Sequence, residues 1–338
     1  MRSVKVGAVG LGRLGRRHAE NIAFKIPNAE LKAVCSIVQE EIDTARREWG
    51  IEYGYNSFEE MLENHELDAV CISSSSTAHC RQIAQALERG LHVFCEKPLG
   101  VGLEEIRTAQ QIVEKNADKV FQLGFMRRYD ASYVYAKKKI TEGLIGHPIL
   151  LRCYGLDPVN AITGAIAFAE KSGGLFVDMA IHDFDLARWL LASEAASVYA
   201  MGGCYAYKEF EKYGDIDNGA ALVEFKNRTM GFFYAGRTCT HGYHIETEVI
   251  GTKGSLRIGT VPYKNLVTIC NETGVSNECI GGFLERFEAA YINEMQSFID
   301  CILQNKKPDV EVIDGVKSTE IAYAATKSLA TKEIVFLD

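Results

Sequence analysis

A short polar stripe interrupts an otherwise apolar segment near the middle of the chain. From Leu175 to Leu191 nearly every residue is apolar, which predicts a buried helix. Within it, Asp178, His182 and Asp185 stand at i, i+4 and i+7, so they share one face of a helix. A buried carboxylate or imidazole is costly unless it is paired or faces a wet cavity. The stripe predicts either a cleft lined by an interacting Asp178 and His182, or a purely structural Asp–His pair.

Proton transfer from an alcohol is the chemistry that this stripe could support. A histidine, with an unperturbed pKa of about 6.5, suits the role of general base. Asp178, one turn before His182, would favour the imidazolium that forms when the ring takes up a proton.

A lysine in a second motif could supply positive charge to the same reaction. Lys97 belongs to Glu96-Lys97-Pro98, which follows the strand pattern Leu91–Cys95. In doubly wound sheets the carboxyl ends of the parallel strands face the cofactor cleft. Lys97 would there stabilise a developing alkoxide. The alternative is an ordinary lysine on the surface of a loop.

A glycine-rich turn near the N-terminus predicts a dinucleotide site. The strand pattern Val4–Val9 runs directly into Gly10-Leu11-Gly12-Arg13-Leu14-Gly15 and then a helix to about Phe24. Gly10 permits the tight turn, Gly12 lets the backbone approach a pyrophosphate, and Gly15 lets the helix pack on the strand. The N-terminus of that helix would face the phosphate charge.

Two hydroxyl-bearing positions bear on the choice of cofactor. Ser36 ends the strand pattern Leu31–Ser36, where NAD-binding domains often carry an acid for the ribose hydroxyl. A serine does not repel a 2′-phosphate as an acid would, which leaves NADP open. No arginine stands beside Ser36 to attract that phosphate, so we expect NAD. The hydroxyl-rich segment Ser73–Thr77 follows the strand pattern Asp68–Ile72. It predicts either a loop that contacts the cofactor or the N-cap of the next helix.

Strand and helix patterns alternate up to Phe125, which predicts a doubly wound α/β domain over residues 1–125. Residues 126–338 show several strand patterns, such as the clear alternation of Tyr243–Ile250, and two long helices. They predict an α+β domain with a large open, mostly antiparallel sheet that leaves one face for self-association. Val159–Ala167 is expected to form a flexible loop over the cleft, and Phe283–Leu303 one amphipathic helix.

Composition excludes several classes of protein. The 338 residues carry a net charge of −8, which argues against nucleic acid or an anionic membrane as partner. No apolar run could span a bilayer, and the chain enters a strand at Val4 without a signal-peptide pattern, so we expect a cytoplasmic protein. The ten cysteines lack metal-ligand spacing, so we expect reduced thiols and no metal.

Three motifs in this order resemble the Gfo/Idh/MocA oxidoreductase family over essentially the whole chain. They are Gly10–Gly15, Glu96-Lys97-Pro98, and Gly173-Gly174 followed by Asp178 and His182-Asp183. Two further stretches, Gly124–Asp130 and His241-Gly242-Tyr243, look like the inositol 2-dehydrogenase branch.

The resemblance implies hydride transfer between NAD and a hydroxyl-bearing carbon of a cyclic polyol in inositol catabolism, by a homotetramer. It implies a catalytic set of Lys97, Asp178 and His182. The implied substrate contacts are Arg127, Asp157, Asn160, His182 and Tyr243. The expected cofactor contacts are Gly10, Gly12, Arg13, Leu14, Gly15, Ser36, Ser74, Ser75, His79, Glu96 and Lys97.

Two rival functions remain open at this stage. One is another oxidoreductase on the same scaffold, acting on a sugar or sugar nucleotide or exchanging hydride between two sugars. The other is a dinucleotide-sensing regulator without turnover. A sensor needs neither Lys97 nor the Asp178–His182 pair, and both are present, which favours an enzyme.

Overall fold

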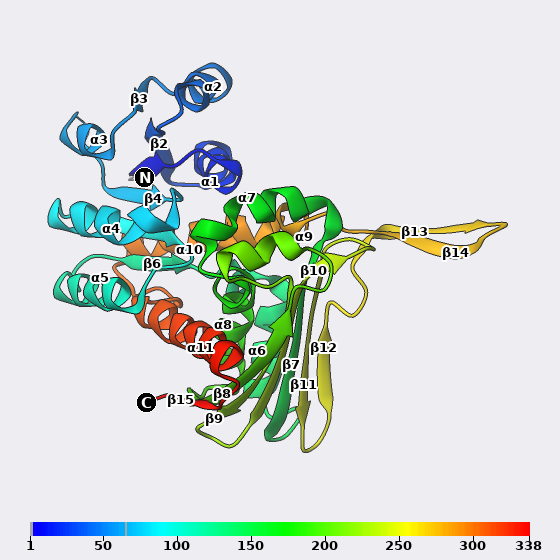
Figure 1. Cartoon of the computed structure of the whole chain (residues 1–338). Helices are drawn as coiled ribbons and strands as arrows, with labels where there is room; N and C mark the ends of the chain where they lie inside the picture. Colours follow the sequence, from blue (N-terminus) through cyan, green and yellow to red (C-terminus); the bar gives the residue numbers. More distant parts are fainter. Residues whose placement is uncertain (1–2, 65) are drawn as a thin grey trace. The chain divides into compact units, whose positions relative to one another are not determined.

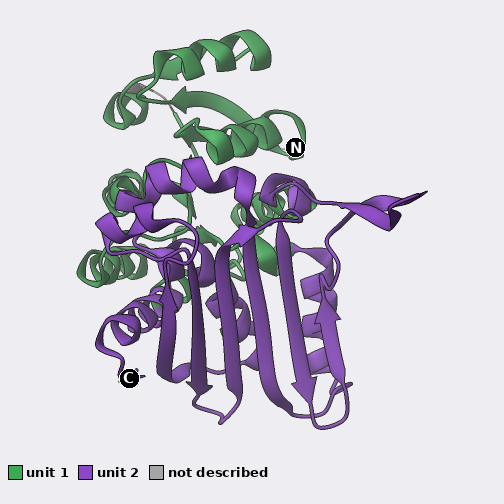
Figure 2. Ribbon diagram, turned by 45° about the vertical axis from the view of Figure 1, so that its right-hand side comes forward, with its two compact units in different colours: residues 1–129, 289–316 green, residues 130–288, 317–338 purple. Residues whose placement is uncertain are grey.

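The computed structural model describes residues 3–64 and 66–338, which form two compact units (Figure 1, Figure 2). Unit 1 comprises Met1–Tyr129 and Ala289–Val316, and unit 2 comprises Asp130–Glu288 and Lys317–Asp338. The sequence predicted a single boundary at residue 125, whereas in the structure residues 289–316, here called the returning segment, fold with unit 1.

Unit 1 is built on a parallel sheet of six strands. The strands are β1 (Val4–Val9), β2 (Ala29–Cys35), β3 (Tyr53–Tyr55), β4 (Ala69–Ile72), β5 (His92–Glu96) and β6 (Phe121–Gly124). Their order is β3-β2-β1-β4-β5-β6, which is the Rossmann order. Strands are added to the sheet on one side of β1 up to β3 and on its other side from β4 on, so the ligand-binding switch point of this unit lies at the carboxyl ends of β1 and β4. The predicted doubly wound domain is confirmed.

The helices of unit 1 follow the predicted alternation. They are α1 (Arg13–Phe24), α2 (Gln39–Trp49), α3 (Phe58–Asn64), α4 (His79–Glu88), α5 (Leu103–Lys115) and α10 (Glu288–Gln304). Side chains of α1, α2 and α10 share one hydrophobic core with the strands, including Ile22, Ile42 and Phe298. α2 carries Glu40 and Glu41 in its first turn and Arg46 and Arg47 in its last, which complements the helix dipole.

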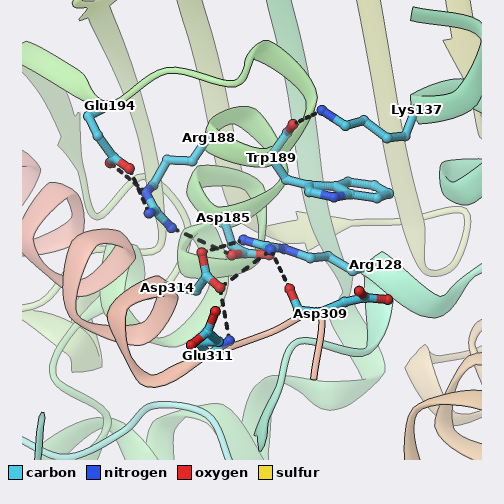
Figure 3. Close-up of polar contacts among 9 residues, drawn as sticks. All are labelled: Arg128, Lys137, Asp185, Arg188, Trp189, Glu194, Asp309, Glu311 and Asp314. Atoms are coloured by element: carbon cyan, nitrogen blue, oxygen red, sulfur yellow. Dashed lines mark hydrogen bonds and ion pairs between the residues drawn. The ribbon is translucent and has the colours of Figure 1, made fainter. Parts of the chain in front are cut away.

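Specific contacts hold the returning segment to unit 1. Gln122 Nε2 donates to the backbone oxygen of Glu294 over 2.8 Å. Arg128 donates to the Asp314 carboxylate over 2.8 Å and to the backbone oxygen of Asp309 over 3.2 Å (Figure 3). These partners lie more than 170 residues apart, so the amphipathic pattern of α10 could not show which core it joins.

Unit 2 contains a sheet of seven strands with one face covered. The strands are β7 (Pro148–Pro158), β8 (Ala195–Gly203), β9 (Asn218–Phe225), β10 (Met230–Cys239), β11 (His244–Gly251), β12 (Ser255–Ile258) and β15 (Val335–Phe336). Their order is β12-β11-β7-β10-β9-β8-β15, and only β7 and β10 pair in parallel. The predicted open, mostly antiparallel sheet is confirmed.

Three helices of unit 2 pack on the covered face of this sheet. They are α6 (Ala131–Thr141), α8 (Ile181–Leu191) and α11 (Val312–Thr331). The core gathers buried side chains of α8, α11 and the strands, and the ring of Phe184 stands 4.8 Å from that of Phe233. The apolar run Leu175–Leu191 is therefore buried, as its composition predicted.

Two predicted segments of unit 2 differ in the structure. Val159–Ala167 was predicted as a loop, but Val159–Ala161 forms a 3-10 turn that continues as α7 (Ile162–Ser172). Its alanines favour a helix, and Gly173, in the left-handed conformation with φ 77°, ends it. Phe283–Leu303 was predicted as one helix, but α9 (Phe283–Arg286) ends before Phe287. Phe287 leaves the helical conformation and buries its ring near Tyr243.

Unit 2 also carries a protruding hairpin that the sequence pattern did not predict. β13 (Tyr263–Asn271) and β14 (Gly274–Cys279) pair only with each other and extend from unit 2 (Figure 1). Every residue of β13 is exposed, so hydrophobic periodicity had no buried face to report. In the part of the chain that the structure describes, no helix is both long enough and apolar enough to cross a membrane.

Candidate active site

The glycine-rich loop of unit 1 meets the loop that follows β4. Gly10 has a φ of 82°, and a Cβ there would lie 2.6 Å from the backbone nitrogen of Ser74. A Cβ on Gly15 would lie 1.8 Å from the backbone oxygen of Gly10. No larger residue fits at either position without moving the backbone. The two loops at the switch point of the sheet are therefore in direct contact.

The N-terminus of α1 is open to an anion. Gly12 is its N-cap, and no described atom lies within 4 Å of the place where a Cβ would point. No side chain caps the helix and no acidic residue stands in its first turn, which begins at Arg13 and Leu14. The pyrophosphate of a dinucleotide fits this arrangement, because the backbone N–H groups and the helix dipole both favour negative charge.

Ser36 has an acidic partner that the sequence analysis missed. Its hydroxyl donates to Glu41 Oε2 over 2.5 Å and accepts the backbone N–H of Val38 over 3.1 Å. Glu41 lies in the first turn of α2, six residues beyond the end of β2. An acid is expected at the end of the strand itself, so the sequence pattern did not point to Glu41. A carboxylate beside Ser36 can accept a ribose hydroxyl and repels a 2′-phosphate.

Replacing Glu41 with glutamine is expected to weaken the preference for NADH over NADPH by about tenfold, because the repelling charge is removed. Fluorescence titration would measure both dissociation constants in the variant. Glu40→Gln, which removes an exposed charge from the same helical turn, is the matched control and should leave the ratio unchanged. An unchanged ratio in Glu41→Gln would contradict this role.

His79 joins the two loops that flank the expected cofactor position. Its ring is buried, with Nδ1 2.8 Å from the backbone oxygen of Pro98 and Nε2 3.1 Å from that of Ser74. Burial lowers the pKa of this imidazole. Ser74 Oγ donates to Gln82, and the hydroxyl of Ser75 lies near that of Thr77. His79 therefore acts on this edge of the sheet by holding the loops together.

Lys97 stands half-buried directly after β5, as its place after the strand pattern predicted. Its backbone N–H donates to Glu96 Oε2 over 3.1 Å. The Glu96 carboxylate itself is buried, and its other oxygen lies 2.7 Å from His18 Nε2. The structure thus directs Glu96 into the interior of unit 1, beneath the lysine.

A second carboxyl group, Glu294 of α10, lies in the same interior. Burial and the neighbouring Glu96 carboxylate raise the pKa of Glu294 well above its usual range, which favours its protonated form in the folded protein. The unfolded chain releases that proton near its ordinary pKa. Between these two pKa values the folded state binds more protons than the unfolded chain does, so the free energy of unfolding falls as pH rises.

Glu294→Gln is expected to raise the melting temperature of the protein at pH 8 and to change it less at pH 4.5, because an amide cannot ionise. Calorimetry at both pH values would measure the difference. Glu272→Gln, on the exposed hairpin, is the control and should shift neither value. A shift in Glu294→Gln that is independent of pH would contradict the protonated state.

In unit 2, Asp178 sits in a π-helical turn. The turn Phe176–Ala180 precedes α8, and Gly173 and Gly174 before it have φ values of 77° and 89°. Leu175 N–H donates to Asp215 Oδ1 over 2.7 Å, which fixes the entry of the chain. π turns interrupt regular helices at functional sites more often than elsewhere.

A buried arginine holds Asp178. Arg237, near the end of β10, places Nη2 3.1 Å from Asp178 Oδ2, and its guanidinium stands 5.1 Å from the ring centre of Phe210. The side chain of Arg237 is 2% exposed and that of Asp178 is 23% exposed. Asp215 Oδ2 lies 3.9 Å from the same Nη2. No sequence signal pointed to Arg237, which lies 59 residues from its partner.

His182 lies in the first turn of α8 and is buried. Asp185, the third member of the predicted stripe, stands 3.9 Å from Arg188, which donates to Glu194 over 2.7 and 2.8 Å (Figure 3). A π turn contains more residues than an α turn, so the spacing of 3.6 residues no longer keeps Asp178 aligned with Asp185. Asp185 belongs to a structural cluster, and the contact of Asp178 with His182 stays a prediction.

Two of the predicted substrate residues come together at one end of the unit 2 sheet. His244 of β11 pairs with Leu156 of β7, so Tyr243, which directly precedes β11, lies at the same end of the sheet as Asp157 of β7. Arg237 lies near the same end, because Cys239 of β10 pairs with Pro158 of β7. Asn160 is exposed in the 3-10 turn after β7, and Arg127 is buried in unit 1.

Comparison with known proteins decides the family. Residues 4–125 match the NAD-binding Rossmann fold of an oxidoreductase family, and residues 133–257 match the GFO/IDH/MocA C-terminal domain. The chain belongs to the Gfo/Idh/MocA oxidoreductase family. This Gfo/Idh/MocA protein is an NAD-dependent oxidoreductase, and the fold predicted by resemblance is confirmed.

Similar members of the family have been named for inositols. The scyllo-inositol 2-dehydrogenase (NAD(+)) of Bacillus subtilis is 39% identical, over 99% of this chain and 96% of its own. The structure of scyllo-inositol dehydrogenase from Lactobacillus casei with bound NAD(H) and scyllo-inositol is 44% identical, with a TM-score of 0.96 over 99% of each chain. The structure of myo-inositol 2-dehydrogenase from Lactobacillus plantarum is 35% identical, with a TM-score of 0.98 over 100% of each chain.

Proposed function

We propose that this Gfo/Idh/MocA enzyme oxidises one secondary hydroxyl of an inositol to a ketone with NAD, and that scyllo-inositol is its better substrate. The relatives named for scyllo-inositol, at 39% and 44% identity, are more similar to this chain than those named for myo-inositol, at 32% and 35%. The observation that carries the proposal is the ion pair between the buried Arg237 and Asp178. Asp178 stands one turn before His182, and Arg237 lies at the end of the sheet that holds Asp157 and Tyr243.

In the proposed reaction three residues share the work. His182 takes the hydroxyl proton as general base, and Asp178 stabilises the imidazolium that results. Lys97 would stabilise the charge that develops on the oxygen. The carbon loses a hydride with its electron pair, so the C–O bond becomes a carbonyl. Gly12 and its neighbours at the α1 N-terminus would hold NAD, which would supply the acceptor for that hydride.

Selection of a polyol falls to the polar residues of the site. Asp157, Asn160 and Tyr243 of unit 2 and Arg127 of unit 1 would bind the hydroxyls that do not react. A site that binds hydroxyls rejects analogues lacking them, because its polar groups would be left without partners. We propose that the enzyme works in the cytoplasm in the catabolism of inositol.

A spectrophotometric assay of NAD and NADP reduction tests the proposal, with scyllo-inositol, myo-inositol and glucose in turn. Turnover of an inositol with NAD is expected, with kcat/KM higher for scyllo-inositol. Turnover of glucose alone would replace the substrate and keep the chemistry. Binding of NAD without turnover of any polyol would instead make the protein a dinucleotide-sensing regulator.

We propose that the enzyme is a homotetramer whose copies meet on the open face of the unit 2 sheet. On that face the register aligns Tyr199, Leu222 and Phe232 across β8, β9 and β10, and Met201, Ala220 and Tyr234 beside them. Leu222 and Met201 are each 56% exposed. A contiguous apolar stripe of this kind is typical of an interface between copies.

Leu222→Glu is expected to dissociate the assembly by placing charges inside the interface. Sedimentation velocity would show the change in mass. Leu266→Glu, at an even more exposed leucine on the hairpin β13–β14, is the control and should leave the mass unchanged. A wild-type protein that sediments as a monomer would refute the proposed tetramer, and an unchanged mass in Leu222→Glu would exclude this face as the contact.

A further inference from the structure

Three titratable side chains from distant parts of the sequence meet in the interior of unit 1. His18 comes from α1, Glu96 from the end of β5 and Glu294 from α10. His18 Nε2 lies 2.7 Å from Glu96 Oε1 and 3.9 Å from Glu294 Oε1. The His18 ring stands 5.1 Å from Phe94 and 5.6 Å from Tyr291, so aromatic side chains surround the group.

This cluster places polar groups inside a core at a cost in free energy. The side chains of His18 and Glu294 are 0% exposed, and neither carboxyl oxygen of Glu294 hydrogen-bonds any described residue. Burying such groups costs several kcal/mol, and apolar residues of the same volume often stabilise a protein as well or better. A role outside stability is therefore required to account for the cluster.

A metal ion does not fit between these ligands. Two ligands of one tetrahedral zinc, each about 2.1 Å from the ion, stand roughly 3.4 Å apart. His18 Nε2 and Glu96 Oε1 are only 2.7 Å apart, which is a hydrogen-bond distance. The cluster is therefore a hydrogen-bonded group, and its effect has to be sought in what Glu96 touches.

Glu96 connects the cluster to Lys97. Its Oε2 accepts the backbone N–H of Lys97 over 3.1 Å. A Cβ at Gly124 of the neighbouring strand β6 would lie 2.9 Å from the carboxyl carbon of Glu96, so the carboxylate is confined on that side as well. His18 lies on the helix whose first turn follows the glycine loop. The cluster thus links the cofactor-binding helix to the backbone of Lys97 within one unit.

We propose that His18 and Glu294 are positioning residues of Lys97, which hold the Glu96 carboxylate and through it the backbone of the lysine. This inference rests on the proposed role of Lys97 as alkoxide stabiliser. Glu96 anchors the lysine backbone, and His18 fixes the rotamer of Glu96. Glu294 contacts His18 as well, with its Oε1 3.9 Å from His18 Nε2, and limits the movement of the ring. A displacement of about 1 Å at a reacting group can lower a rate by about a hundredfold.

A double-mutant cycle between His18 and Lys97 tests the proposal. His18→Leu is expected to lower kcat for inositol oxidation by at least about tenfold in the wild-type background. In the Lys97→Met background the same change should alter kcat less than about twofold, because the lysine is no longer there to be positioned. The dissociation constant of NADH should change less than about threefold in all variants.

Two further variants separate positioning from folding. His18→Gln retains a hydrogen-bond donor toward Glu96 and should restore at least half of the lost rate on a logarithmic scale. His92→Leu changes a histidine at the other end of β5, where its Nδ1 accepts the N–H of Val120, and should leave kcat unchanged. If His18→Leu proves unstable, His18→Gln alone is carried through the cycle with Lys97→Met.

The outcomes distinguish this inference from the proposed function. An equal loss of kcat from the His18 change in both backgrounds overturns the positioning role while leaving inositol oxidation intact. A loss of kcat that is accompanied by a matching loss of NADH affinity or of melting temperature overturns the positioning role as well. A wild-type enzyme without inositol turnover, or a Lys97→Met variant with full turnover, refutes the proposed function itself and with it the premise of the inference.

Discussion

Replacing Lys97 with methionine is expected to lower kcat for inositol oxidation by at least about a hundredfold. Methionine has a similar length and no charge, so it removes the stabilisation of the developing alkoxide and little else. The glycine loop and the α1 N-terminus, which would hold the pyrophosphate, are not changed. The dissociation constant of NADH should therefore change less than about threefold, and kcat and kcat/KM should fall together.

Steady-state kinetics and fluorescence titration of NADH check this expectation on the same preparation. Lys115→Met is the control, because it removes a lysine from the last turn of α5 in the same unit. It should keep at least half of the wild-type kcat. A Lys97→Met variant with nearly normal kcat would remove the lysine from the mechanism. A rise in KM alone would limit it to binding the substrate.

The sequence carried most of the information about unit 1. A parallel sheet buries strands on both faces, so β1, β4 and β5 read as short apolar runs, and each turn after a strand has its own residue signature. The roles of Gly10 and Gly15 could be predicted from the glycine motif. The motif is informative because no side chain fits at either position. Glu41 was missed because its carboxylate reaches Ser36 from the next helix rather than from the end of β2.

Contacts between distant segments were not predictable to the same degree. The amphipathic pattern of α10 shows that the helix has a buried face but not which core receives it, and the returning segment lies in unit 1. His18, Glu96 and Glu294 likewise look unrelated in the sequence, where 78 residues separate the first two. Such groups become visible only when tertiary packing places their atoms together.

The centre of unit 2 shows how a regular pattern can mislead. The i, i+4, i+7 spacing of Asp178, His182 and Asp185 assumes a uniform helix. The π turn Phe176–Ala180 breaks that assumption at the residue expected to do chemistry. The π turn is stabilised by an ion pair with β10, because it brings the Asp178 carboxylate within 3.1 Å of Arg237. π turns of this kind are more frequent at functional sites than elsewhere in helices.

Arg237→Met is expected to lower kcat by about ten- to a hundredfold and to destabilise unit 2 by about 1–3 kcal/mol. Removing one member of a fully buried ion pair costs about 3–5 kcal/mol. The cost here is smaller because the Asp178 side chain is 23% exposed, and water can partly solvate the carboxylate that remains. Burial already raises the pKa of Asp215, and without the guanidinium two carboxyl groups would face each other. Asp178 would then be less able to support an imidazolium at His182.

Arg237→Lys and Arg228→Met make this expectation specific. Lysine restores the charge but not the planar fork, so it should recover only part of kcat. Arg228 pairs with Glu224 at the end of β9 and is 85% exposed, and its loss should change stability by less than about 0.5 kcal/mol. NADH binding should be unchanged in every variant, since the proposed cofactor contacts belong to unit 1. Calorimetry and steady-state kinetics distinguish two roles of Arg237. A loss of stability without a change in kcat would make Arg237 a packing residue. A loss of kcat that Arg237→Lys partly recovers would show that Arg237 acts on the reaction through Asp178.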